Sequence, residues 1–339
     1  MSRGVWPYAL TNYELRCYLL GLFVSKNRFT SRMDWRVIGQ LIRLGRPLFL
    51  AGGFLWHGLG VVIALHEGAA LHWPTILWGQ IAITATQLLT HYSNEYFDLP
   101  ADLANQTPTH WSGGSRVLVV GGIRPELSLL LAIMFGGLAL LAAGVLVVGL
   151  RRGPWTLPLL FLALFLAWNY SSPPLRLHSR GVGELSAALL VPGLTPLVGF
   201  YLQVGYFTWL PLLAVWPLVC LQFVMLLTIE FPDAAGDGVA GKRTLVVRLG
   251  GQRAARLLVG VLGLAYGSWV GLVPAGLPPI AALSFLAISG PIALWLGWQM
   301  NKKAWAVPGR WNDLSFWAIT LLMTATIAEL IAFLSEYVA

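Results

Sequence analysis

Long apolar runs constrain this chain of 339 residues more than any other feature. Each run approaches the roughly 20 residues that an α-helix needs to cross the hydrocarbon core of a bilayer. A spanning backbone must satisfy its hydrogen bonds within the protein, which leaves helices or a closed barrel. Barrel strands would alternate apolar and polar residues, and these runs do not. We therefore predict an all-α, multi-spanning bundle of about nine transmembrane helices, over residues 47–66, 74–92, 127–149, 155–171, 186–204, 209–229, 254–273, 277–299 and 314–334.

The charges support this class and indicate an orientation. Charged residues make up 11% of the chain, about half of the fraction that soluble proteins carry. With the N-terminus placed in the cytoplasm, 20 of the 22 Lys and Arg residues fall on the cytoplasmic side, and Arg151 and Arg152 fall on the other. This asymmetry follows the positive-inside rule, so the net charge of +8 reports topology rather than a nucleic-acid partner. We predict a multi-pass protein of the plasma or inner cell membrane, with residues 1–33 as a cytoplasmic or interfacial extension and residues 34–339 as one transmembrane domain.

Two acidic clusters lie at the ends of apolar runs, at residues 94–102 and 230–237, and hold six of the 14 acidic residues. Carboxylates near hydrocarbon usually face a polar cavity or a partner. Each cluster repeats Asp at positions i and i+4, and oxygen ligands at that spacing suit Mg²⁺ shared with a phosphorylated substrate. Ordinary interfacial carboxylates would explain one cluster, but two clusters favour a functional site. Because Pro100 and Pro232 interrupt the helices, we expect the second span to end near Pro100, with Asp102 on the following turn, and Asp233 and Asp237 to open a loop.

A Gly-rich basic stretch follows each cluster, at residues 112–116 and 238–244. Backbone amides in tight turns, with Lys or Arg beside them, bind phosphate well. The loop at residues 169–181 and the residues before the first span add further cations and a phenol, and for these the positive-inside rule or the interfacial aromatic belt is an equal explanation. The predicted substrate-binding residues are Asn94, Arg43, Arg116, Tyr170, Arg176, Arg180, Lys242 and Arg243.

The spacing Asn94-xxx-Asp98-xxx-Asp102, with Asp233-xxx-Asp237 and the stretch 241–245, resembles the UbiA superfamily of intramembrane prenyltransferases. The resemblance covers the chain from about Arg43 onward, and residues 112–115 and 173–185 resemble the branch that attaches polyprenyl chains to dihydroxynaphthoate for menaquinone. It implies a nine-helix bundle with a central cavity, open to lipid and capped on the cytoplasmic side. It also implies that Mg²⁺ and an isoprenoid diphosphate are held by the metal-binding set Asn94, Asp98, Asp102, Asp233 and Asp237, of which the four aspartates are the catalytic residues.

The sequence departs from that pattern at Glu95, where many relatives have Asp, and at Arg176 or His178, where many have Lys. The function that the resemblance implies is Mg²⁺-dependent transfer of a polyprenyl group to an aromatic acceptor such as 1,4-dihydroxy-2-naphthoate, in menaquinone or related quinone biosynthesis. The expected partners are the two substrates and the lipid bilayer, with no nucleic acid and no protein partner inferred. Alternatives are a cation transporter that uses the carboxylates, an alcohol phosphotransferase, or a prenyltransferase for hydroxybenzoate, homogentisate, a chlorophyllide, haem or a glycerol lipid.

Overall fold

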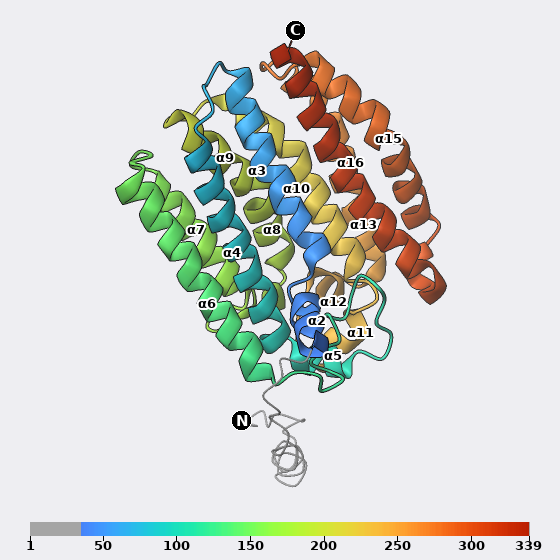
Figure 1. Ribbon diagram of the computed structural model, residues 1–339. Coiled ribbons are helices and arrows are strands. Elements are labelled where there is room, and N and C mark those ends of the chain that lie inside the picture. Colours follow the sequence, from blue (N-terminus) through green and yellow to red (C-terminus); the bar gives the residue numbers. More distant parts are fainter. Residues whose placement is uncertain (1–34, 339) are drawn as a thin grey trace, which may run out of the picture. The chain divides into compact units, whose positions relative to one another are not determined.

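Every predicted apolar run is helical in the computed structural model, which describes residues 35–338 (Figure 1). Within these residues there is no strand, so the all-α prediction is confirmed. The long helical segments are α3 (Pro47–His66), α4 (Trp73–Phe97), α6 (Pro125–Gly144) with the π-helical η1 (Val145–Gly149), α7 (Thr156–Ser171), α8 (Gly183–Ala188) with η3 (Leu189–Leu194) and α9 (Thr195–Val204), α10 (Trp209–Ile229), α13 (Gly251–Gly267) with α14 (Trp269–Leu272), α15 (Pro279–Asn301) and α16 (Trp311–Val338).

Among residues 35–338, seven helical segments are long and apolar enough to cross a membrane, so the chain is a multi-pass membrane protein. The predicted count of nine is not confirmed by these criteria. Helix α7 has only 16 residues, and α4, although it has 25 residues, includes polar residues such as Gln80, Gln87 and Thr90. Some of these side chains face an internal cavity described below, which explains how α4 can lie among apolar helices with a mixed composition.

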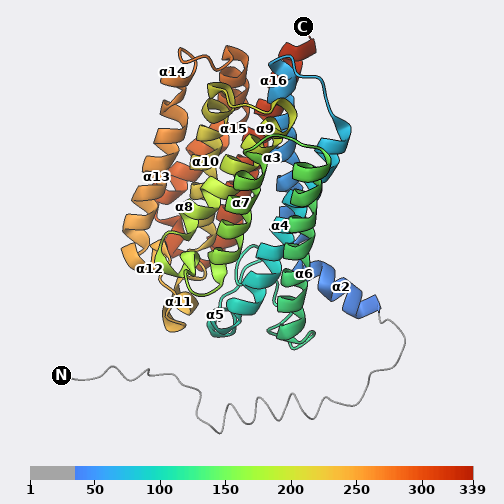
Figure 2. The same ribbon diagram turned by 90° about the vertical axis from the view of Figure 1, so that its left-hand side faces the viewer.

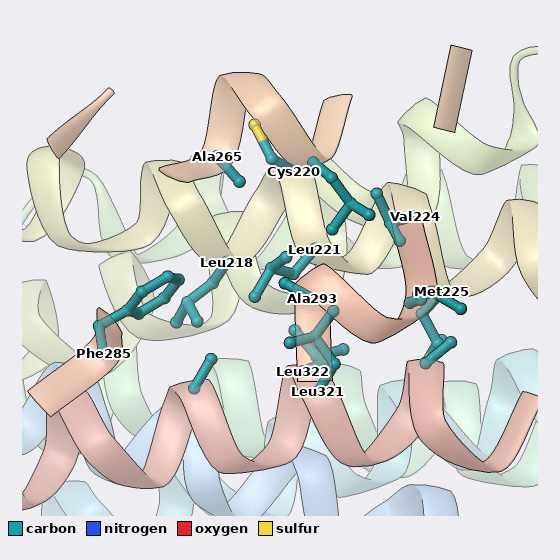
Figure 3. Packing of buried hydrophobic residues seen from close by; sticks show 14 of the residues in the cluster. Leu218, Cys220, Leu221, Val224, Met225, Ala265, Phe285, Ala293, Leu321 and Leu322 are labelled. Atoms are coloured by element: carbon teal, nitrogen blue, oxygen red, sulfur yellow. The ribbon is translucent and has the colours of Figure 1, made fainter. Parts of the chain in front are cut away.

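Close helix packing depends on small residues at a few positions. A Cβ atom at Gly60 of α3 would overlap the backbone carbonyl of Pro196 in α9, and one at Gly199 would lie 2.6 Å from the carbonyl oxygen of His57. Small residues let helix backbones approach in this way in membrane proteins. The largest hydrophobic cluster joins α3, α10, α13, α15 and α16. Figure 3 shows part of it, including Leu218, Leu221, Phe285, Leu321 and Leu322.

The two acidic motifs follow α4 and α10, and both end in a short helix. Helix α4 ends at Phe97, and α5 (Leu99–Ala104) carries Asp102. Helix α10 ends at Ile229, and α11 (Ala234–Val239) has Asp233 as its N-cap residue and carries Asp237. The expectation of a turn at Asp102 and a loop from Asp233 to Asp237 was therefore wrong. Pro100 lies in the first turn of α5, where a proline costs no hydrogen bond, and Pro232 lies before the N-cap of α11, outside that helix. Figures 1 and 2 place α5, α11 and α12 (Leu245–Leu249) together, at the end of the bundle away from the C-terminal end of α16.

The remaining described elements are α2 (Trp35–Leu44) and the short 3₁₀ helices η2 (Leu177–Arg180), η4 (Ala304–Ala306) and η5 (Pro308–Arg310). Residues from 39 onward form one compact unit. The predicted extension, residues 1–33, lies outside the described residues, so its boundary with the transmembrane domain stays a prediction.

Candidate active site

A cavity of about 690 Å³ opens inside the bundle at the end that carries α5 and α11. Its walls come mainly from α3, α4, α10 and α16, and α7, η3 and α9 contribute further lining residues. Both acidic motifs contribute to it, although they are far apart in the sequence. All five residues of the predicted metal-binding set line the cavity: Asn94, Asp98, Asp102, Asp233 and Asp237.

Direct contacts hold the two motifs together. The side-chain amide of Asn105, just after α5, donates a hydrogen bond of 2.7 Å to Oδ1 of Asp233, and the backbone N–H of Gly113 donates one of 3.0 Å to Oδ2 of the same carboxylate. Gly236 of α11 packs on Asn105 so closely that a Cβ atom there would lie 2.9 Å from the Asn105 Cα. The position of Asp233 is therefore fixed by residues that follow the first motif.

Lys242 forms a second link between the motifs. Its Nζ lies 3.0 Å from Oδ2 of Asp98 and 3.6 Å from Oδ1 of Asp237. Burial by itself would lower the pKa of Lys242, but the two carboxylates outweigh this effect and raise it. The side chain is thus a fixed ammonium group at the polar end of the cavity, which is the arrangement that attracts a phosphate.

Asp98 has the most hydrogen-bond partners of the four aspartates. Nε2 of His178 lies 2.5 Å from its Oδ1, and the Asn94 amide donates to its Oδ2 at 2.9 Å. The other ring nitrogen of His178 lies 2.6 Å from the carbonyl oxygen of Tyr170, which fixes the orientation of the imidazole. Burial alone would raise the pKa of Asp98, but His178 and Lys242 hold it well below its usual range. Asp98 is therefore ionised and held in one orientation.

The pKa values of the other three aspartates are raised, so ionising these side chains costs more free energy. Burial and the charge of Asp98 raise the pKa of Asp102 to about 7. Burial and the charge of Asp233 raise the pKa of Asp237 to about 6, against the opposing effect of Lys242. Burial also raises the pKa of Asp233. Carboxylates crowded beyond what the neighbouring cations can compensate are the electrostatic condition that a bound cation relieves.

The donor set fits Mg²⁺ that is shared with a phosphorylated ligand. No group of three or more His, Cys, Asp and Glu side chains converges to hold a metal by itself among residues 35–338. Such convergence is not required, because Mg²⁺ usually keeps several waters and binds through one or two carboxylates together with substrate phosphates. The cavity offers five such side chains with hard oxygen atoms at one end.

The predicted substrate-binding residues separate into two groups. Asn94, Tyr170 and Lys242 line the cavity. Arg116 is outside the lining, and its guanidinium donates to the backbone carbonyl of Asp102 at 2.5 Å. The other four side chains are exposed and do not line the cavity, so their contact with substrate stays a prediction: Arg43, Arg176, Arg180 and Arg243.

Several residues of the site were not predicted from the sequence. Glu95 is buried and accepts hydrogen bonds from Nε of Arg46 at 3.0 Å and from the backbone N–H of Ser115 at 2.8 Å. Glu95 therefore joins the cavity-lining Arg46 to the Gly-rich stretch. The sequence feature that could have indicated this role is a charged residue within an apolar helical run. Glu230 also lines the cavity, and burial together with the charge of Glu184 raises its pKa well above the ordinary value.

Apolar helices surround a cavity with two oxygen-rich motifs and a lysine at one end, which defines the class of membrane protein that can hold an anionic group together with a metal cation. The chain belongs to the UbiA prenyltransferase family, whose model matches residues 54–320. It is accordingly a prenyltransferase, and the resemblance seen in its motifs is confirmed. The cation transporter and the alcohol phosphotransferase gain no support from this match.

Two curated relatives are similar to parts of the chain. One is the 1,4-dihydroxy-2-naphthoate octaprenyltransferase of Mycobacterium tuberculosis, which is 29% identical over 208 residues, or 61% of this chain and 68% of the relative. The other is the 2-carboxy-1,4-naphthoquinone phytyltransferase of Synechocystis sp., which is 30% identical over 116 residues, or 34% of this chain. The match covers only 38% of the length of the Synechocystis protein.

Solved structures share the fold. A UbiA homolog from Aeropyrum pernix K1 in its apo form superposes with a TM-score of 0.64 at 17% identity, covering 83% of this chain and 98% of that chain. A UbiA homolog from Archaeoglobus fulgidus bound to DMAPP and Mg²⁺ gives a TM-score of 0.54 at 16% identity, covering 86% of this chain and 99% of that chain. At these identities the likeness supports the architecture and does not identify substrates.

Proposed function

We propose that this protein transfers a polyprenyl group from its diphosphate to 1,4-dihydroxy-2-naphthoate, or to a closely related aromatic acceptor, in a Mg²⁺-dependent reaction of menaquinone or related quinone biosynthesis. The observation that carries the proposal is the convergence of both aspartate motifs and Lys242 at one end of one cavity. The name of the Mycobacterium tuberculosis relative supports dihydroxynaphthoate as the acceptor.

The polar end of the cavity would bind the diphosphate. Asn94, Asp98, Asp102, Asp233 and Asp237 would hold Mg²⁺, which supplies charge neutralisation of the leaving group when it is bound. Lys242 adds a positive charge at the same place, between Asp98 and Asp237. Preorganised charges of this kind, aimed at the atoms where negative charge develops, are usually the largest contribution to catalysis.

The remainder of the cavity suits the hydrocarbon part of the donor. Its walls include Phe49, Leu55, Leu160, Phe316 and Met323. Burying each CH₂ group of a prenyl chain contributes about 0.8 kcal/mol. Apolar walls also exclude water, which would otherwise capture the allylic cation and convert transfer into hydrolysis.

The bonds that change follow from the two substrates. The allylic carbon–oxygen bond of the donor breaks, and its electron pair leaves with the diphosphate. A carbon of the electron-rich acceptor ring then forms the new carbon–carbon bond. The ring regains aromaticity by losing a proton, or by losing carbon dioxide where the attacked carbon carries a carboxylate.

We further propose that the site faces the cytoplasm of a cell that carries the protein in its plasma or inner membrane. The support is the placement of Lys and Arg residues: with the nine spans predicted from the sequence, 20 of 22 fall on the side of the acidic motifs. A cytoplasmic site gives access to soluble precursors of the acceptor and to Mg²⁺.

The test is transfer by membranes that contain the wild-type protein or single variants. Labelled polyprenyl diphosphates and a panel of acceptors are supplied, and products are identified by mass spectrometry. Asp98→Ala and Asp233→Ala should abolish transfer while the protein still accumulates in the membrane. Glu126→Ala is the matched control, because it removes an exposed carboxylate at the start of α6, outside the cavity. Full activity in both aspartate variants, or no prenylated product with any acceptor, would refute the proposal.

A further inference from the structure

Two glutamines precede the first aspartate of the two acidic motifs by the same number of residues. Gln87 of α4 precedes Asp98 by 11 positions, and Gln222 of α10 precedes Asp233 by 11 positions. Eleven helical residues rise about 16 Å and complete slightly more than three turns, so Gln87 lies on the same face of α4 as Asp98. Helix α10 ends at Ile229, so Gln222 lies about two turns before the end of α10, and Asp233 follows on the turn after that helix. Both side chains line the cavity.

Both carboxamides have a buried oxygen without a hydrogen-bond partner. Gln222 is only 4% exposed, and its Oε1 accepts no hydrogen bond. Oε1 of Gln87 is in the same state. A buried polar atom that is left unpaired costs roughly 1–3 kcal/mol. The Gln87 carboxamide packs against Gly53 of α3, because a Cβ atom there would overlap its oxygen. Both side chains line the cavity, so these carboxamides are available to a ligand there that donates hydrogen bonds.

Three other polar side chains that line the cavity already donate hydrogen bonds within the protein. The Thr86 hydroxyl donates to the Ala82 carbonyl at 2.8 Å, the Thr195 hydroxyl donates to the Leu190 carbonyl at 3.3 Å, and the Trp56 indole donates to Thr326 Oγ1 at 3.2 Å. A hydrocarbon tail cannot pair with a carboxamide oxygen, whereas a ring hydroxyl can donate to it.

We propose that Gln87 and Gln222 form the subsite for the aromatic acceptor, with their carboxamide oxygens accepting hydrogen bonds from its ring hydroxyl groups. The ligand class is a phenol or a hydroquinone. This inference rests on the proposed function, and it adds the residues that select and orient the second substrate. A site built to pair with a substrate hydroxyl discriminates strongly against an analogue that lacks it, because the site's own polar groups are then left unpaired.

The experiment measures transfer kinetics of purified Gln87→Leu and Gln222→Leu with varied acceptor and varied donor. Each variant should raise the KM for the acceptor roughly tenfold and leave the KM for the donor diphosphate unchanged. The wild type should also prefer the free hydroquinone to its methyl ether, and each variant should lose most of that preference. Gln222→Met, which keeps the side-chain length, repeats the measurement if Gln222→Leu fails to accumulate.

Gln203→Leu in α9 is the matched control. Gln203 is also buried, its Oε1 accepts from the backbone N–H of His72 at 3.0 Å, its Nε2 has no hydrogen-bond partner, and it does not line the cavity. This variant should leave both KM values unchanged. An unchanged acceptor KM in the Gln87 and Gln222 variants would overturn the subsite, and so would a changed preference for donor chain length without a change in acceptor KM. Absence of transfer by the wild type with every acceptor would instead refute the proposed function.

Discussion

Replacing Gly236 by alanine tests whether the contact between α5 and α11 sets the geometry of the site. The new Cβ atom would lie 2.9 Å from Cα and 3.1 Å from the backbone nitrogen of Asn105, whereas ordinary contact begins at 3.4 Å. Because these neighbours are backbone atoms, they cannot rotate away as a side chain can. Helices α5 and α11 must therefore separate by about 0.5 Å, which stretches the hydrogen bond from Asn105 to Asp233.

Gly236→Ala should lower both activity and stability. Overpacking costs about 1–3 kcal/mol, and alanine returns up to about 1 kcal/mol of helix propensity relative to glycine. A displacement of 1 Å in a catalytic group can cost about 10²-fold, so half of that displacement should lower kcat/KM roughly tenfold. The assay compares prenyl transfer with the thermal unfolding midpoint of the same purified protein in detergent.

Gly238→Ala is the matched control for this change. Gly238 lies in the same helix two residues later, has an ordinary backbone conformation, and has nothing within 4 Å of its Cβ position. It should gain helix propensity and keep full activity. Equal activity of Gly236→Ala and Gly238→Ala would refute the argument that the spacing of α5 and α11 controls catalysis.

Three further outcomes are expected. Glu95→Gln removes the charge that pairs with the Arg46 guanidinium, which is 27% exposed, so the free energy of unfolding should fall by about 1–3 kcal/mol. Thermal unfolding checks this, and an unchanged midpoint, as expected for the exposed Glu126→Gln, would contradict it. The affinity for Mg²⁺ should fall roughly 20-fold between pH 8 and pH 6. The cause is that protons compete with the cation for Asp102 and Asp237, whose pKa values are about 7 and about 6. Calorimetry measures this affinity, and a value that does not change with pH would refute the reasoning. Trp56→Ala removes an indole that packs on Gly52 inside the cavity, so kcat/KM should shift toward longer donors, and an unaltered chain-length profile would exclude this role.

The apolar runs predicted the helices well, because a backbone in hydrocarbon has few alternatives to a helix. The acidic motifs also lie together in the structure, as their rarity near hydrocarbon indicated. Arg43, Arg176, Arg180 and Arg243 show the limit of such reasoning. The positive-inside rule places a cation on one side of the membrane, but it does not say whether the side chain faces a cavity or solvent.

The uncharged residues of the site were the hardest to predict. Asn105 lies beyond the spaced aspartates, and its contact with Asp233 depends on how two short helices pack. Gln87 and Gln222 sit inside apolar runs, where an uncharged polar residue often pairs with a neighbouring helix. Their matching distance from the first aspartate of each motif is visible in the sequence. It acquires meaning only once both are known to line one cavity.

The bond between Lys242 and Asp98 joins residues 144 positions apart. Membrane helices are inserted as the ribosome delivers them, so the first motif reaches the bilayer well before the second. A nascent chain that carries α4 and α5 alone has neither Asp233 nor Lys242. The site that we propose for the diphosphate is therefore complete only after Asp233, α11 and Lys242 have been synthesised.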